Sequence, residues 1–179
     1  MKKLFSEIPC IRGERVTVRK LELSDADGLR ELCESDEVYR FLPAILFEQK
    51  YEDKKEVIRK LYDECLEESL ILGVFVGGEF CGLAELYGYR AETGEVSVGI
   101  RLLKRYRGKG VASETLTVML DWLLKETDIK KVSASTMPEN KASAKSLESF
   151  GFECVARGVK ADWGYDSLTL SDKWMYSLK

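Results

Sequence analysis

One stretch, from Glu95 to Glu126, constrains the fold of this chain more than any other. It begins with a short apolar segment, Val96–Ile100, turns through residues 105–110, and continues with apolar residues at helical spacing. A strand that enters a helix through such a turn leaves the first N–H groups of the helix without intrahelical acceptors. Because these groups lie at the positive end of the helix dipole, the stretch predicts a site for an anion, above all a phosphate.

The turn itself has the composition of an anion-binding loop. Gly108 and Gly110 remove two side chains where a ligand would approach the main chain, and Arg105, Arg107 and Lys109 add positive charge beside them. The turn lacks the Gly-x-x-x-x-Gly-Lys-Ser/Thr run of a P-loop and the three-glycine spacing of a dinucleotide fingerprint. An ordinary strand-to-helix loop with solvated basic residues is the alternative interpretation.

The composition excludes several kinds of chemistry. The chain has no histidine, which rules out Ser-His and Cys-His nucleophile pairs, histidine general bases and histidine-ligated metals. Its five cysteines are widely scattered and include no Cys-x-x-Cys pair. They are typical of reduced thiols in a cytoplasmic protein, so we predict neither a disulfide framework nor a metal site.

Length and charge predict a single domain over residues 1–179 with a sizeable core. A formal net charge of −3 gives no general reason to expect nucleic acid or an anionic membrane as a partner. No apolar run approaches the ~20 residues that span a bilayer, and the N-terminus lacks the apolar core of a signal peptide. The chain is expected to be a monomer or a homodimer.

The hydrophobic pattern predicts a mixed α/β domain. Strand-like alternation and helix-like spacing follow one another as a strand, two or three helices, three strands in a meander, and then helix, strand, helix and two strands. The predicted strands are residues 15–21, 70–76, 80–89, 96–100, 130–136, 152–159 and 173–178, and the predicted helices begin near Ser24 and cover 36–41, 51–66, 111–126 and 141–150.

Three separate segments together carry a family resemblance. They are the turn Arg105-x-x-Gly108-x-Gly110, the run Asn140-Lys-Ala-Ser143 followed by Glu148-Ser-Phe-Gly151-Phe152, and the opening strand through Val18-Arg19 into residues 24–27. With these segments the chain resembles the GNAT superfamily of acetyl-CoA-dependent N-acyltransferases over nearly its whole length. In pattern it is most similar to the branch that contains the ribosomal-protein alanine N-acetyltransferases.

This resemblance implies a central twisted, mostly antiparallel sheet flanked by helices, with a parallel strand pair that splays apart to hold acetyl-CoA. It places the pyrophosphate on the main-chain N–H groups of the turn and the pantetheine arm near Asn140, with Ser143 near the thioester sulfur. Asn140 can also be a helix N-cap, and Ser143 a plain helix residue that faces solvent. The residues expected to bind the cofactor are Val98, Gly99, Ile100, Arg105, Tyr106, Arg107, Gly108, Lys109, Gly110, Val111, Asn140 and Ser143.

The same resemblance implies direct attack of a neutral amine on the thioester, with a main-chain N–H near residues 98–100 steadying the developing oxyanion. Ser97 stands where the related branch usually has a glutamate, and Glu95 lies two residues earlier on the same strand face. We therefore name Glu95, Ser97 and Ser143 as catalytic candidates, with Glu95 as the first candidate base, acting through a water. A surface carboxylate near a turn is the alternative for Glu95.

The acceptor is predicted to be a primary amine. On the neighbouring strand, Glu85 and Tyr87 are candidates for lining its site, although ordinary exposed strand residues would explain them equally well. An enzyme with a weak base favours an amine of low pKa, so an α-amino group of a protein or peptide is the first choice. A small amine such as a polyamine, amino acid or aminoglycoside is the alternative, and a non-catalytic CoA-binding module is a third interpretation.

Overall fold

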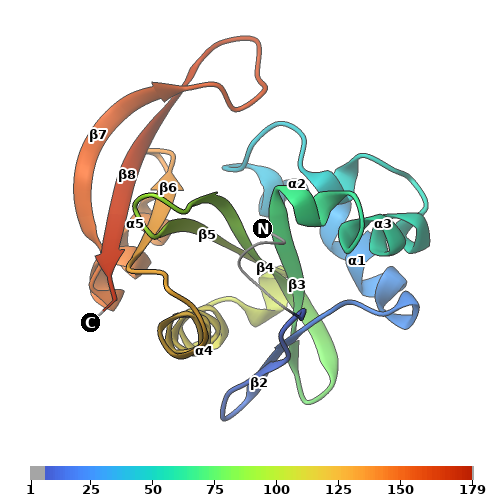
Figure 1. The fold of residues 1–179 in the computed structure, drawn as a ribbon. Coiled ribbons are helices and arrows are strands. Elements are labelled where there is room, and N and C mark those ends of the chain that lie inside the picture. The colour runs from blue at the N-terminus through green and yellow to red at the C-terminus, as the bar shows by residue number, and fades with distance from the viewer. Residues whose placement is uncertain (1–6, 179) are drawn as a thin grey trace.

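The computed structural model describes residues 7–178 and arranges eight strands in one twisted sheet (Figure 1). The strand order is β1-β2-β3-β4-β5-β6-β8-β7. Every neighbouring pair is antiparallel except β5 and β6, which run parallel, so the predicted mixed sheet with one parallel pair is confirmed. The strands are β1 Ile11–Arg12, β2 Val16–Arg19, β3 Ser69–Val76, β4 Glu79–Arg90, β5 Glu95–Leu102, β6 Lys131–Thr136, β7 Glu153–Ala161 and β8 Thr169–Ser177.

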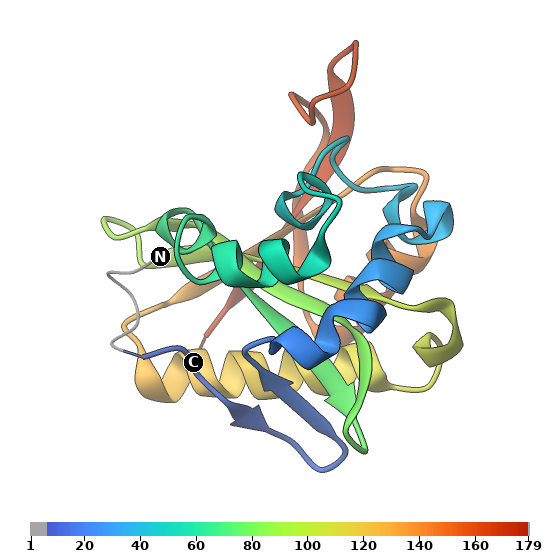
Figure 2. The same cartoon turned by 90° about the vertical axis from the view of Figure 1, so that its right-hand side faces the viewer.

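Helices cover both faces of the sheet (Figure 2). The helices α1, α2 and α3 pack against one face, and the long helix α4 packs against the other. Within residues 7–178, no helix combines the length and the apolar character that a membrane crossing requires. The helices are α1 Ala26–Cys33, α2 Asp36–Tyr39, α3 Lys54–Leu61, α4 Val111–Glu126 and α5 Lys141–Phe150, with 3-10 turns η1 Leu23–Asp25, η2 Phe47–Gln49, η3 Cys65–Glu67 and η4 Lys104–Tyr106.

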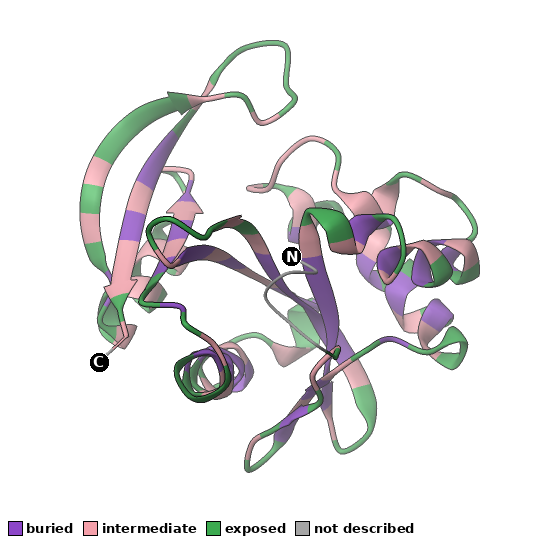
Figure 3. Ribbon diagram, viewed as in Figure 1, coloured by how far each residue is buried: buried purple, intermediate pink, exposed green. Residues whose placement is uncertain are grey.

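The core is divided between the two faces of the central strands, which are buried on both sides (Figure 3). Successive side chains of a strand point to opposite faces, so Leu72 packs in the same cluster as Met119 of α4, whereas Ile71 packs with Leu29 of α1. A strand covered on both faces is nearly continuously apolar, and this is the pattern of β3. The polar residues that do occur on these buried strands therefore stand out.

The helix predicted for residues 51–66 is shorter in the structure. It begins after Asp53, whose side chain caps it by accepting the N–H of Lys55 at 2.9 Å, and it ends at Leu61. Tyr62 then leaves the helical conformation, and its hydroxyl accepts the N–H of Leu21 at 2.7 Å. The remaining apolar residues of the predicted helix form η3.

The chain closes with the hairpin of β7 and β8. The last strand, predicted for residues 173–178, already begins at Thr169, and it lies between β6 and β7. Its ladder with β6 extends from Lys131 to Thr136, over the whole of that strand. Because of this pairing, β6 is held along its full length by β8 and needs no support from β5.

Candidate functional site

The parallel strands β5 and β6 are paired at only three positions. The ladder joins Glu95–Ser97 to Lys131–Ser133 and then stops, although β5 continues to Leu102 and β6 to Thr136. At the last pair, the hydroxyl oxygens of Ser97 and Ser133 lie 2.8 Å apart. Beyond that point, one edge of β5 has no strand partner, and such an edge can pair with an extended ligand that carries amide groups.

The loop at the end of β5 leaves the start of α4 uncapped. Gly108 and Gly110 have φ values of +68° and +78°, in the left-handed region that glycine adopts without strain. Gly110 is the N-cap, no side chain caps the helix, and the first intrahelical bond is Glu114 N–H to Gly110 O at 2.9 Å. Within residues 7–178, the N–H groups of residues 111–113 thus have no protein acceptor, and the anion site that the sequence places there stays a prediction.

The side chains of the loop hold it against α1 and α2. The guanidinium of Arg105 forms a two-pronged ion pair with Glu31, and that bonding lowers the pKa of the Glu31 carboxyl. Arg107 donates to the carbonyl of Leu102 at 3.0 Å and contacts Glu37 at 3.4 Å. These two arginines, expected to supply charge to an anion, are committed to protein carboxylates in the structure. Within residues 7–178, the main-chain N–H groups at the start of α4 have no such partner.

A third carboxylate holds the loop from the side of β2. In the first turn of α4, Glu114 accepts the main-chain N–H groups of Arg15 at 2.6 Å and Val16 at 3.0 Å, and also the Arg15 Nε at 2.9 Å. Arg15 Nη1 in turn donates to the carbonyl of Lys109 at 3.1 Å. The N–H of Arg15 is the main reason that the pKa of Glu114 is lowered. No sequence signal points to this contact, because its partners are 99 residues apart.

Gly99 opens a gap on the face of β5 that looks toward α1 and α3. The register pairs Ser97 with Tyr87 of β4 and Gly99 with Glu85, so these predicted site residues share one face. Gly99 is not one of the glycines with positive φ, so its conformation does not require glycine. A Cβ placed there would meet only the ring edge of Tyr87, at 3.9 Å. A strand glycine in open space is typical of a position that a ligand approaches closely.

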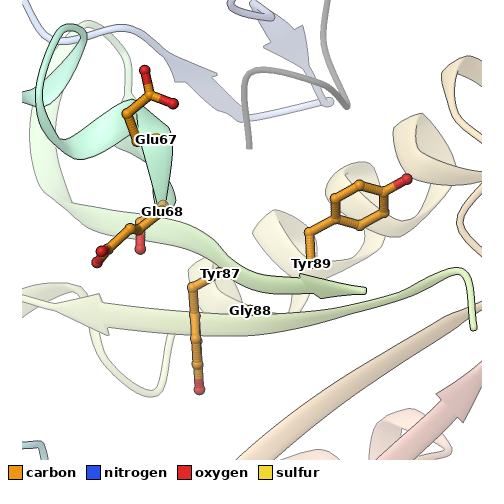
Figure 4. Close-up of a pocket in the computed structure, with 6 residues that line it drawn as sticks. Glu67, Glu68, Tyr87, Gly88 and Tyr89 are labelled. Atoms are coloured by element: carbon orange, nitrogen blue, oxygen red, sulfur yellow. The ribbon is translucent and has the colours of Figure 1, made fainter. Parts of the chain in front are cut away.

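The ring edge of Tyr87 borders this gap, and its hydroxyl interacts with Ser97. Burial, followed by the negative charge of Glu85, raises the pKa of Tyr87 to about 12. A cavity of about 400 Å³ lies along the end of β4, where Tyr87 and Tyr89 point to opposite faces (Figure 4). Its lining residues are Glu67, Glu68, Ser69, Tyr87, Gly88 and Tyr89.

Glu95 is not brought to the gap. It lies where β5 and β6 are still paired, and its carboxylate is 3.6 Å from the Arg90 guanidinium across the β4–β5 ladder. Four residues of strand separate Glu95 from Gly99, which corresponds to about 13 Å along β5. Its role as a base stays a prediction.

Asn140 and Ser143 follow β6, the strand on the other side of the opening. Asn140 is the N-cap of α5, and its side-chain oxygen accepts the N–H of Ser143 at 3.2 Å. The cap uses the carbonyl oxygen of the amide and leaves its NH₂ group for another partner. Both residues are partly buried. The two predicted halves of the site, the β5 loop and the start of α5, thus follow the two strands that part.

Comparisons with known proteins agree with this arrangement. Residues 15–153 match the family model described as acetyltransferase (GNAT) domain. The chain is 29% identical over 168 residues to the uncharacterized N-acetyltransferase p20 of Bacillus licheniformis, covering 92% of this chain and 93% of the relative.

Solved structures share the fold at lower identity. An acetyltransferase from Salmonella typhimurium that modifies the N-terminal serine of ribosomal protein L7/L12 superposes with a TM-score of 0.80 at 14% identity, covering 96% of this chain and 100% of that one. Spermidine N-acetyltransferase from Vibrio cholerae, in complex with CoA and spermine, gives 0.75 at 18% identity, covering 93% and 97%.

The contact at Glu114 predicts a pH-dependent contribution to stability. Its pKa is lowered in the folded state from an ordinary value of 4.5, so the charged form stabilises the fold above that value and the effect is lost as pH falls through the folded pKa. Urea unfolding of Glu114→Gln should show lower stability than wild type near pH 7 and a shrinking difference below pH 4.5. The exposed Glu92, changed to Gln, is the control. A Glu114→Gln difference that is the same at every pH would contradict the role of the charge.

Proposed function

The chain belongs to the GNAT acetyltransferase family, and from this premise we propose that it transfers the acetyl group of acetyl-CoA to the α-amino group of a protein or peptide. The observation that carries the proposal is the uncapped start of α4, next to the edge of β5 that β6 leaves unpaired. A helix start suits a diphosphate, and a free strand edge suits the amides of a pantetheine arm. The ribosomal-protein modifying enzyme among the structural neighbours acts on such an amine, which supports the choice of acceptor.

The chain offers a holding group for each part of acetyl-CoA. The N–H groups of residues 108–113 would hold the diphosphate, and the free edge of β5 at residues 98–100 would pair with the pantetheine amides. The NH₂ group of Asn140 and the hydroxyl of Ser143 would hold the same arm from the side of α5. The cofactor, when bound, supplies an acetyl group activated as a thioester.

The proton on the acceptor nitrogen decides which amines react. The nitrogen needs a free lone pair to form the C–N bond as the C–S bond breaks and the sulfur departs with the electron pair. The nitrogen then releases one proton to water, and the thiolate takes one up. An α-amine of pKa ~7.7–8.0 costs about 1 kcal/mol to deprotonate at pH 7, whereas a lysine at ~10.4 costs roughly 4.6 kcal/mol. A main-chain N–H of residues 98–100 stabilises the developing oxyanion, and a thiol of pKa ~8.5 leaves without a strong acid. Low-pKa amines are therefore favoured.

A small amine is the second candidate, and one contact favours it. We expect residues 41–51 and 160–172 to form the walls of the acceptor site. These two segments touch each other, since Ala44 N–H donates to the Trp163 carbonyl at 2.8 Å and the Tyr165 hydroxyl donates to the Leu42 carbonyl at 2.6 Å. A bridge of this kind restricts the space available to a long peptide. The spermidine enzyme among the structural neighbours has the same fold.

Cofactor binding can be tested at Gly108 against a matched glycine. Gly108→Glu should abolish acetyl-CoA binding in calorimetry, because it places a carboxylate in the anion site. Gly77→Glu, in the β3–β4 turn, is the control: both glycines have similar positive φ, +68° and +59°, and a Cβ meets nothing within 4 Å at either. Both variants should lose similar stability, and only the first should lose the cofactor. Unchanged affinity in Gly108→Glu would remove the proposal.

The acceptor can be tested with one peptide that carries both kinds of amine. With Ala-Ala-Lys-Ala-amide at pH 7, mass spectrometry should locate the acetyl group on the α-amine, since the neutral fraction of that group exceeds the fraction of lysine on the order of 300-fold. Spermine serves as the competing acceptor. Acetylation of spermine without the peptide would replace the first proposal with the second.

A further inference from the structure

A buried ion network lies under the gap at Gly99. The side chain of Arg101, on β5, is 4% exposed and donates to three carboxylate oxygens. Two belong to Glu48 of η2, at 2.6 and 3.0 Å, and the third belongs to Glu85 of β4, at 2.9 Å. Burying three charges is expensive, and an apolar set of similar volume often stabilises a fold as well. The network therefore calls for an explanation beyond stability.

Glu48 is the better compensated of the two carboxylates. It is fully buried, takes two of the three bonds from Arg101, and accepts the Tyr39 hydroxyl at 3.0 Å. The nearby ammonium of Lys54 donates instead to the main-chain carbonyls of Glu48 and Tyr51, at 2.9 and 2.8 Å. The hydrogen bonds of Lys54 are thus made to main-chain carbonyls, and the Arg101 guanidinium is the cation that contacts both carboxylates directly.

Glu85 keeps one oxygen available. Its Oε2 accepts from Arg101, whereas within residues 7–178 no donor contacts its Oε1, and the side chain is 12% exposed. Its register partner across the β4–β5 ladder is Gly99, whose missing side chain leaves open space on that face. The charge of Glu85 is felt there, because it helps to raise the pKa of neighbouring Tyr87. A partly compensated carboxylate thus borders the position where a ligand can approach β5.

We propose that Glu85 recognises the acceptor, binding its primary ammonium through Oε1 before the nitrogen loses a proton and attacks, and that Arg101 and Glu48 are the positioning residues that hold Glu85 in place. The inference rests on the proposed function, because it takes the acetyl group to lie along β5 at Gly99. It assigns amine recognition to Glu85 in preference to Glu95, which is paired with Arg90 about four residues further back on the strand. The shared chemistry is a primary ammonium, whether it belongs to a peptide or a polyamine.

The geometry also gives a reason for the presence of Glu48 in the network. An isolated carboxylate on a buried strand would be neutralised or would turn away toward solvent. A single bond from Arg101 orients Glu85, while Glu48 accepts the other two bonds of the guanidinium. With Glu48 absent, Arg101 would be free to compensate Glu85 fully, and the attraction for a second cation would fall.

The test measures binding to the enzyme saturated with CoA, so that no reaction occurs. The probes are Ala-Ala-Ala-amide, its Nα-acetyl derivative, which lacks the ammonium, and spermine. Wild type should bind the free-amine peptide or spermine more tightly than the acetylated peptide, by about tenfold or more, which is the scale of a hydrogen bond to a charged group. Glu85→Gln should lose this preference, and Glu48→Gln should weaken it. The exposed Glu92, changed to Gln, should keep it.

The Kd of CoA separates this inference from the proposed function. It should be the same in wild type and in all three variants, and a wild type that fails to bind CoA would overturn the proposed function itself. A Glu85→Gln variant that still prefers the ammonium overturns the assignment to Glu85, as does a wild type without any preference. Where Glu85→Gln is poorly folded, Glu85→Asp is the substitute. It keeps the charge, but its shorter side chain moves the carboxylate away from the ligand, so the preference for the ammonium should be reduced. Loss of the preference in Glu95→Gln, with Glu85→Gln unaffected, would transfer the role to Glu95.

Discussion

The whole site depends on two parallel strands that part after three residue pairs. Each strand survives the separation because its other edge is held by an antiparallel ladder, β4 for β5 and β8 for β6. Main-chain groups that would be expensive to leave unpaired in a closed sheet are thereby offered to a ligand. The hydroxyl pair of Ser97 and Ser133 marks the point of separation.

The first N–H groups of α4, the helix that follows β5, are also left without side-chain partners. No side chain caps α4, and the carboxylates that hold its loop, Glu31, Glu37 and Glu114, engage arginine side chains or the main chain of β2. The loop is thus anchored from outside, and the N–H groups at the start of the helix stay free. In this arrangement Arg105 and Arg107 anchor the loop, and the attraction for the proposed anion would come from the helix start.

Local features of the sequence were sufficient for much of this fold. The hairpin at Gly77-Gly78, the glycine turn into α4 and the cap at Asn140 depend on neighbouring residues, and the sequence predicted all three elements. The contacts that complete the site are of another kind. Arg101 and Glu48 are 53 residues apart, and no local pattern announces which carboxylate a buried arginine will meet. The point at which β6 leaves β5 is also not readable from the sequence. Periodicity gives the face of a strand, but it does not show that Glu95 lies in the paired part of β5 and Gly99 beyond it.

Amide hydrogen exchange tests directly whether the main-chain N–H groups at the start of α4 bind a diphosphate. In the free protein, the N–H groups of residues 108–113 should exchange rapidly, because they have no protein acceptor within the part of the chain that the structure describes. Saturation with CoA should slow their exchange more than that of any other stretch outside the free edge of β5. Unchanged exchange at residues 108–113, with CoA bound and protection located elsewhere, would contradict the account.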